Sequence, residues 1–168
     1  MVEVRLRAVR VDLQSNTPVL LLQESEALGR TLPIFIGAPE ATAIAFALEG
    51  VDTPRPLTHD LMKDVLDVVG VTVAQVVVTE LRDQTYFAEL VLTAFGETYT
   101  VSSRPSDAIA LAVRVKCPIL ADSELLDVAG YLEDPGEEEV EDESVSPDEV
   151  VEEFRNFIDS VNPDDFAS

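Results

Sequence analysis

Two short alanine-rich segments constrain most strongly how this chain can fold. Residues 43–48 read AIAFAL, and residues 108–113 read AIALAV. Pro39 and Gly50 bracket the first segment as a helix, and the second lies within a helix predicted over residues 105–115. Because these helices have few polar positions, both are expected to be buried.

The two segments match each other at a fixed offset, and each follows a predicted β-hairpin. A duplicated hairpin-helix unit would explain the match. Two unrelated small-residue helices packed closely on one sheet would explain it equally well. Both interpretations place the helices against strands.

The remaining apolar stretches alternate as strands do. Between Val2 and Leu13 the apolar positions change from even to odd numbers near Ala8, which predicts a β-bulge or a sharp bend there. The predicted strands after the first are residues 17–24, 32–36, 71–81, 84–95, 97–102 and 118–120. The fold class is therefore α+β, with a mixed, mostly antiparallel β-sheet packed against buried alanine-rich helices.

A further helix is predicted between Thr58, a good N-cap, and Gly70, a good terminator. Its pattern is amphipathic. The predicted inner stripe is Leu61, Met62, Val65, Leu66 and Val69. The predicted solvent side is Asp60, Lys63, Asp64 and Asp67. A small helix over residues 123–129 is expected to follow the last strand.

The net charge of −22 divides the chain into three parts. Residues 1–132, with a net charge of −8, are long enough for one domain with a single core. Residues 133–146 are acidic and almost free of apolar side chains, so they are expected to form a flexible linker. Residues 147–168 are predicted to form an amphipathic helix and a tail. This helix is expected to dock on its own core, on a sister subunit or on another protein.

The composition also limits the class of protein. Such an acidic surface has no broad basic footprint for nucleic acid, so any nuclease activity would depend on local cations or a bound metal. Cys117 is the only cysteine, which fits a reducing cytoplasmic location, and no segment reads as a secretory signal or a membrane span. Apolar residues on both faces of the long strands predict a homo-oligomer, most simply a dimer.

Two polar clusters, each at the start of a predicted helix, carry the candidate chemistry. Residues 54–60 include the only histidine, His59, beside Asp60, and residues 104–107 read RPSD. Glu40, Asp60 and Asp107 each lie in the first turn of a helix, where carboxylates could hold a divalent metal if the helix ends converge. His59 could then act as a general acid or base, and Arg104 could clamp phosphate.

These clusters, together with residues 33–37 (PIFIG) and the following Pro39 and Glu40, resemble the bifunctional nuclease family. The resemblance covers about residues 1–132, and residues 154–166 look like the end of actinobacterial members. It implies a metal-assisted nuclease of broad specificity that hydrolyses phosphodiester bonds of RNA and DNA.

The predicted site residues follow from the clusters and the resemblance together. The predicted catalytic residues are His59, Asp60 and Asp107. The predicted substrate-binding residues are Arg104, Ser106 and Arg55. The predicted metal ligands are Glu40, Asp60 and Asp107, with magnesium or manganese as the ion.

A structural interpretation of the same residues stays open. Carboxylates in a first helical turn are stabilised by the helix dipole alone, by about 0.3 to 1 kcal/mol. His59 could hold the preceding loop, and Arg104 could bridge Asp107 or Glu40. The chain would then be a non-catalytic regulatory or scaffold module that binds a small anion or a protein partner.

Overall fold

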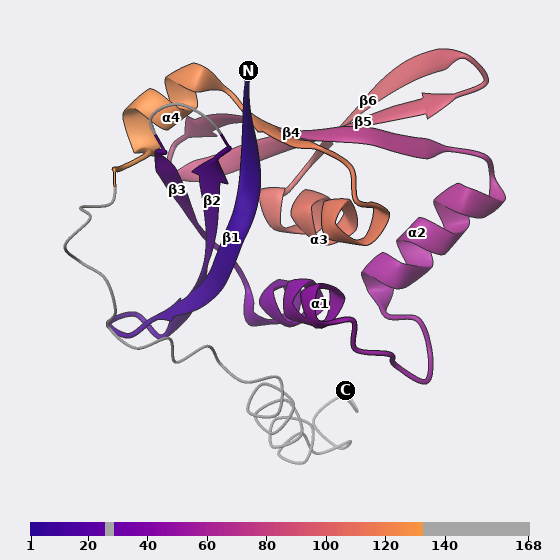
Figure 1. Ribbon diagram of the computed structural model, residues 1–168, viewed down its shortest axis with the longest axis horizontal. Coiled ribbons are helices and arrows are strands. Elements are labelled where there is room, and N and C mark those ends of the chain that lie inside the picture. The colour runs from indigo at the N-terminus through magenta and orange to yellow at the C-terminus, as the bar shows by residue number, and fades with distance from the viewer. Residues whose placement is uncertain (26–28, 133–168) are drawn as a thin grey trace, which may run out of the picture.

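The computed structural model describes residues 1–25 and 29–132 (Figure 1). The strands are β1 (Val2–Asp12), β2 (Thr17–Glu24), β3 (Thr31–Phe35), β4 (Thr72–Arg82), β5 (Thr85–Ala94), β6 (Glu97–Ser103) and β7 (Ile119–Ala121). The helices are α1 (Ala38–Glu49), α2 (Thr58–Val68), α3 (Pro105–Val115) and α4 (Ser123–Ala129). The predicted linker and C-terminal helix lie outside the described residues.

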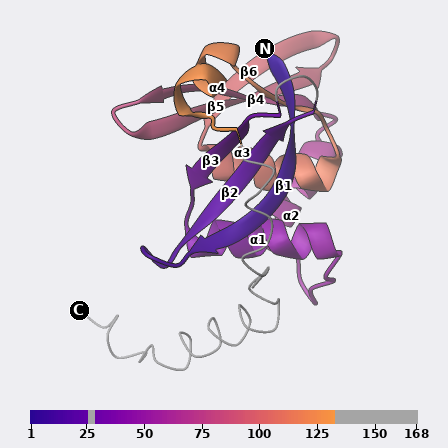
Figure 2. The same ribbon diagram turned by 60° about the vertical axis from the view of Figure 1, so that its left-hand side comes forward.

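The strands form one seven-stranded sheet in the order β3-β2-β1-β7-β4-β5-β6. The pairing of β4 with β7 is parallel, and every other pairing is antiparallel. The predicted α+β class is therefore confirmed. Each half of the sheet is a three-stranded antiparallel meander followed by a helix, α1 in the first half and α3 in the second (Figures 1 and 2). This repeated order of elements matches the repeat seen in the alanine-rich segments.

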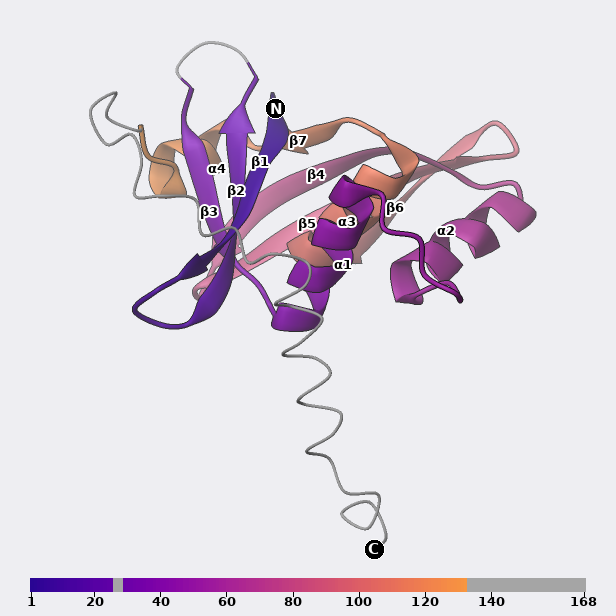
Figure 3. The same cartoon turned by 60° about the horizontal axis from the view of Figure 1, so that its bottom comes forward.

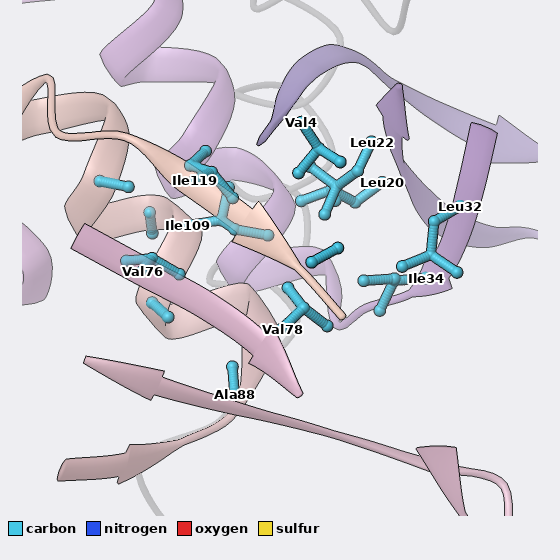
Figure 4. Close-up of a cluster of buried hydrophobic side chains, with 14 of the residues drawn as sticks. Val4, Leu20, Leu22, Leu32, Ile34, Val76, Val78, Ala88, Ile109 and Ile119 are labelled. Carbon is cyan, nitrogen blue, oxygen red and sulfur yellow. The ribbon is translucent and has the colours of Figure 1, made fainter. Parts of the chain in front are cut away.

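β7 joins the two halves, although it has only three residues. Ile119 is the register partner of Val4 in β1 on one side and of Val76 in β4 on the other. These three side chains are buried in the same core cluster (Figure 4). The segment that follows α3 therefore closes the sheet between two meanders that are otherwise separate.

The predicted irregularity near Ala8 is confirmed. The register between β1 and β2 shifts between Leu6 and Ala8, as a β-bulge requires. Val4 before the shift and Val9 after it both contact the core cluster. The bulge therefore lets one long strand keep its apolar side chains inward across the change of register.

The two alanine-rich helices differ in burial. In α3, every residue from Ala108 to Ala112 is buried. In α1, only Ala43 and Ile44 are buried, so the predicted burial extends only to its inner side. The reason is position: α1 packs against α3, β1 and β2 through its inner side (Figure 3), and Leu48, near the end of the helix, is exposed.

The sequence prediction for the amphipathic helix α2 was wrong for most of its inner stripe, although Leu66 packs against the core and Asp64 and Asp67 are exposed as predicted. The predicted inner residues Leu61, Met62, Val65 and Val69 are exposed, and His59 is the buried residue of the helix. Thr58 is not the N-cap either: Leu57 is the N-cap, and its backbone N–H donates to Asp60 Oδ2 at 2.9 Å. Within the described residues, no helix is long and apolar enough to cross a membrane.

A buried ion pair closes the edge of the sheet at β2 and β3. Arg30 donates from Nε to Glu24 Oε2 at 3.0 Å and from Nη2 to Glu24 Oε1 at 2.6 Å, and it also pairs with Asp127 of α4. The hydrogen bonds from Arg30 outweigh burial and lower the pKa of Glu24 below its ordinary value of 4.5. The ionised carboxylate therefore stabilises the folded chain.

We predict that Glu24→Gln lowers the midpoint of thermal unfolding at pH 7 by about 5 °C or more, because it leaves Arg30 without its main partner. Since the folded pKa of Glu24 is lowered, its stabilisation is present above the ordinary value of 4.5 and is lost as the pH falls through the folded value. The variant should therefore lose less stability than the wild type on acidification.

Calorimetry between pH 7 and pH 3 measures this difference. Glu80→Gln is the matched control, because Glu80 forms an exposed pair with Arg82. Equal acid sensitivity in the wild type and Glu24→Gln would show that the pair does not carry the pH dependence.

Candidate active site

The first turns of three helices each contribute a side chain to one group of contacts. α3 packs between α1 and α2, and the first turns of these helices carry Glu40 as the third residue of α1, His59 as the second of α2 and Asp107 as the third of α3. Arg104 is the N-cap of α3. The backbone N–H groups of helix first turns have no partners within the helix, so a region where three helices begin favours negative charge.

Four of the predicted side chains form one hydrogen-bonded network. Arg104 donates from Nη2 to Glu40 Oε1 at 2.8 Å and from Nε to Asp107 Oδ2 at 2.7 Å. His59 Nε2 lies 3.1 Å from Asp107 Oδ1. We call these residues, Glu40, His59, Arg104 and Asp107, the Arg104 cluster. The structure therefore brings together residues that are up to 67 positions apart in the sequence.

The charges in the cluster settle where its protons lie. Burial alone would raise the pKa of Asp107, but hydrogen bonds from Arg104 and His59 outweigh it and hold that pKa below its ordinary value of 3.8. Asp107 is then ionised at neutral pH and can only accept hydrogen bonds. His59 must therefore donate from Nε2, which leaves Nδ1 of the neutral ring as the basic nitrogen.

Exposure differs sharply across the cluster. The side chain of His59 is 8% exposed, whereas that of Arg104 is 67% exposed. Hydrogen bonds to Asp107 raise the pKa of Arg104 above its ordinary value. The cluster thus combines the buried imidazole of His59 and the carboxylate of Asp107 with the guanidinium of Arg104, which solvent can reach.

Asp60 is not part of this cluster. Its Oδ1 accepts from Arg114 Nε at 2.5 Å, and its Oδ2 accepts from the Leu57 backbone N–H. Burial would raise the pKa of Asp60, but these hydrogen bonds lower it. Asp60 therefore holds α2 against α3 rather than facing the other predicted site residues.

Arg114 was missed in the sequence. Its side chain is 6% exposed and also donates to the Ala110 carbonyl oxygen. A lone basic side chain near the end of an otherwise apolar helix needs a partner when it is buried, and this is the signal that could have found it.

The two remaining predicted substrate-binding residues have different surroundings. Ser106 is buried in the first turn of α3. Arg55 is exposed in the loop before α2, and its backbone carbonyl accepts from Thr53 Oγ1. Neither residue makes a hydrogen bond or ion pair with the Arg104 cluster in the part of the chain that the structure describes.

The predicted metal ligands do not form a cation site as arranged. Arg104 bridges Glu40 and Asp107, and Asp60 is paired elsewhere with Arg114. Among residues 1–25 and 29–132, no group of three histidine, cysteine or acidic side chains is placed to hold a metal ion. A guanidinium therefore occupies the position between the carboxylates that the sequence analysis gives to a metal.

A hollow of about 250 Å³ lies next to the Asp60–Arg114 pair, beside the C-terminal half of α1. Its polar lining includes Asp60, Lys63 and Arg114. None of the four residues of the Arg104 cluster lines it. The cluster is therefore reached from the surface through Arg104, and not through this hollow.

Comparisons with known proteins identify the family of the chain. The bifunctional nuclease domain family matches residues 20–134, a range that contains the whole Arg104 cluster. The chain belongs to this family. The resemblance seen in the sequence motifs is confirmed.

The relatives of this chain fall into two kinds, which differ in how much of their length aligns with it. An uncharacterized protein of Mycobacterium tuberculosis is 44% identical over 166 residues, which is 99% of this chain and 98% of that protein. Bifunctional nuclease 1 of Arabidopsis thaliana is 34% identical over 105 residues, which is 61% of this chain and 32% of the plant protein. Bifunctional nuclease 1 of Oryza sativa subsp. japonica is 28% identical over 116 residues. The plant proteins thus share the domain, and the mycobacterial protein shares the full length.

We predict that Asp60→Ala destabilises the fold by about 2 kcal/mol, because it leaves the buried Arg114 unpaired. Replacing both partners, as in Asp60→Ala with Arg114→Met, should recover most of that loss when it is compared with each single replacement. Chemical denaturation of the single and double variants gives the coupling between the two residues. Additive losses would contradict a direct Asp60–Arg114 interaction.

Proposed function

We propose that this chain cleaves phosphodiester bonds of nucleic acids at the Arg104 cluster. The observation that carries the proposal is the His59–Asp107 hydrogen bond, formed beside an exposed guanidinium where three helices begin. Membership of the bifunctional nuclease domain family supports it. A base, its orienting carboxylate and a phosphate-binding cation are then within one hydrogen-bonded group.

His59 is the residue that can move a proton. Asp107 fixes the ring through Nε2 and stabilises the imidazolium that forms when Nδ1 takes a proton. In RNA the proton comes from the 2′-hydroxyl, whose oxygen attacks the adjacent phosphorus as the bond to the 5′ oxygen breaks. A 2′,3′-cyclic phosphate forms, and the departing 5′ oxygen takes a proton from the imidazolium or from water. In DNA a water molecule must supply the attacking oxygen. The same base serves both reactions, and we expect RNA to react faster because its nucleophile is already attached.

Arg104 binds the phosphate. Its guanidinium donates to two carboxylates in the free protein, and a phosphate would replace at least one of them as a bidentate partner. The N–H groups of the α1, α2 and α3 first turns add to the attraction for negative charge. Because residues 1–132 carry a net charge of −8, this local attraction acts against a repulsive surface, so we expect weak substrate binding.

Whether cleavage requires the divalent metal expected from the sequence is a separate question that the experiment below tests. Magnesium or manganese would need Glu40 and Asp107 as ligands, and these carboxylates are held by Arg104. A bound divalent ion supplies charge neutralisation of the phosphate. In the free cluster Arg104 already provides a positive charge at this position.

A second candidate function is favoured by the ion pairs within the cluster, in which Arg104 neutralises Glu40 and Asp107. Arg104 satisfies Glu40 and Asp107 without any ligand, and His59 is nearly buried. This arrangement also suits a regulatory or scaffold module whose cluster locks the three helix ends together or releases them when a small anion binds to Arg104. Such a module would bind anions without cleaving them.

The test is cleavage of a single-stranded RNA by the purified full-length protein. We predict that His59→Ala and Asp107→Asn each lower the rate at least tenfold, which corresponds to about 1.4 kcal/mol of barrier. Arg104→Ala should raise the substrate concentration needed for half-maximal rate. Activity should persist in EDTA, since Arg104 supplies the positive charge.

Asp67→Asn is the matched control, because Asp67 is an exposed carboxylate of α2 that pairs with Lys63 and does not touch the cluster. The control must keep the wild-type rate. If all variants and the wild type show the same residual cleavage, the activity is a contaminant and the module interpretation holds. If EDTA abolishes cleavage and manganese restores it, the metal-assisted mechanism replaces the one proposed.

A further inference from the structure

The apolar side of α2 faces away from the rest of the molecule. The side of this helix that contacts the body carries His59, Asp60 and Lys63, together with the half-buried Leu66. The opposite side carries an exposed set of apolar residues that we call the α2 stripe: Leu61, Met62, Val65, Val68 and Val69. Val65 is 52% exposed and Val68 is 86% exposed. An amphipathic helix with this orientation has its partner surface outside the described fold.

The α2 stripe has the form that a contact between identical surfaces requires. With about 100° between successive residues, the stripe spans roughly 120° and is centred on Val65. Leu61 and Val69 lie one turn before and after Val65 and flank it on either side, and Met62 and Val68 lie farther out. No charged residue falls inside this arc. A two-fold axis beside Val65 would therefore set apolar side chains against apolar side chains along the whole helix.

We propose that a second copy of this chain docks on the α2 stripe, with the two α2 helices antiparallel about a two-fold axis. Leu61 of one copy then lies level with Val69 of the other, and the two Val65 side chains meet near the axis. The apolar residues interdigitate in the way that packed helices do. The polar side of each α2 keeps its contacts with its own body.

The size of the contact indicates that a second element takes part. An eleven-residue helix is about 16 Å long, which is short for the roughly 800 Å² per partner of a stable dimer. The β5–β6 hairpin lies at the same end of the molecule as α2 (Figures 1 and 3). It exposes Phe95, Tyr99 and Val101, and β6 is the edge strand of the sheet, with one side unpaired among the residues that the structure describes. These residues supply the remaining apolar area, and an open strand edge is a common site of self-association.

Charge predicts an unusual salt dependence for this dimer. Each copy has a net charge of −22, so two copies repel one another outside the α2 stripe. Added salt screens this repulsion and leaves the apolar contact in place. The dimer should therefore become tighter as salt increases.

The dimer would also bear on the Arg104 cluster, and this consequence alone rests on the proposed function. His59 lies at the N-terminal end of α2, and its hydrogen bond to Asp107 is one of the side-chain contacts between α2 and α3. Docking a second copy on the far side of α2 would restrict the helix and hold His59 against Asp107. Dimerisation is then expected to support the site without contributing a residue to it.

Sedimentation velocity at micromolar concentration tests the proposal on the full chain. The wild type should sediment with about twice the mass of the 18.3 kDa chain, and Leu61→Asp and Val65→Asp should shift it to the monomer. Leu13→Asp is the matched control, because Leu13 is an exposed leucine far from α2 in the sequence, in the turn between β1 and β2. Unchanged circular dichroism in all variants shows that the monomer fold is intact.

Val65→Cys adds a second readout that does not depend on breaking the contact. Under mild oxidation it should form disulfide-linked dimers, whereas Val128→Cys on the exposed side of α4 should not. A monomeric wild type would overturn the proposal. If Val65→Asp also lowers the melting temperature of that monomer, the result would indicate that residues 147–161 cover the α2 stripe within one chain. A dimer that survives both aspartate variants would overturn it too, since another surface would then hold the copies together.

Discussion

Burial of α3 is the constraint on which the rest of the structure depends. The residues Ala108 to Ala112 are excluded from water by α1, α2 and the sheet, and their small side chains allow these elements to approach closely. Because α1 and α2 pack on the same helix, their first turns can place Glu40 and His59 near Arg104 and Asp107, while Asp60 reaches Arg114 in the last turn of α3. The Arg104 cluster is therefore a consequence of how the core packs, and its charged residues lie at the end of an apolar helix where the core meets water.

The acidity of the chain shapes what this site can do. A surface with a large negative charge does not attract nucleic acid over long distances, so recognition must come from contacts within the cluster. Arg104 is suited to this because it is exposed and already oriented by two carboxylates. The same arrangement explains why Glu40, Asp60 and Asp107 are not placed together as metal ligands among the described residues: Asp60 is paired with Arg114, and Arg104 bridges the other two.

The sequence predicted the features that depend on local pattern. The ends of α1, α3 and α4, the α+β class and the bulge near Ala8 follow from periodicity and from the positions of proline and glycine. The convergence of Glu40, His59, Arg104 and Asp107 was expected as one arrangement of the predicted helix starts. Features that depend on distant partners were not predictable in this way. The Asp60–Arg114 pair joins residues 54 positions apart, and nothing in the pattern around Asp60 separates it from Asp107.

The orientation of α2 shows the limit of periodicity most clearly. The pattern of Leu61, Val65 and Val69 shows that one side of the helix is apolar, but it does not show which surface covers that side. His59 and Asp60 reverse the expected orientation because their partners, Asp107 and Arg114, both lie on α3. Two hydrogen-bonded pairs of this kind fix the polar side inward, and the apolar side is left exposed on the described part of the chain.

The most direct test of the central claim is ¹⁵N nuclear magnetic resonance of the imidazole, because His59 is the only histidine in the chain. At neutral pH we predict that the neutral form of the His59 ring carries its proton on Nε2 and donates it to Asp107. We also predict that uridine 3′-monophosphate shifts the ring resonances. Arg104→Ala should remove that response. A neutral ring protonated on Nδ1, or ring resonances that do not respond to the nucleotide, would contradict the assignment of this cluster as a phosphodiester-cleaving site.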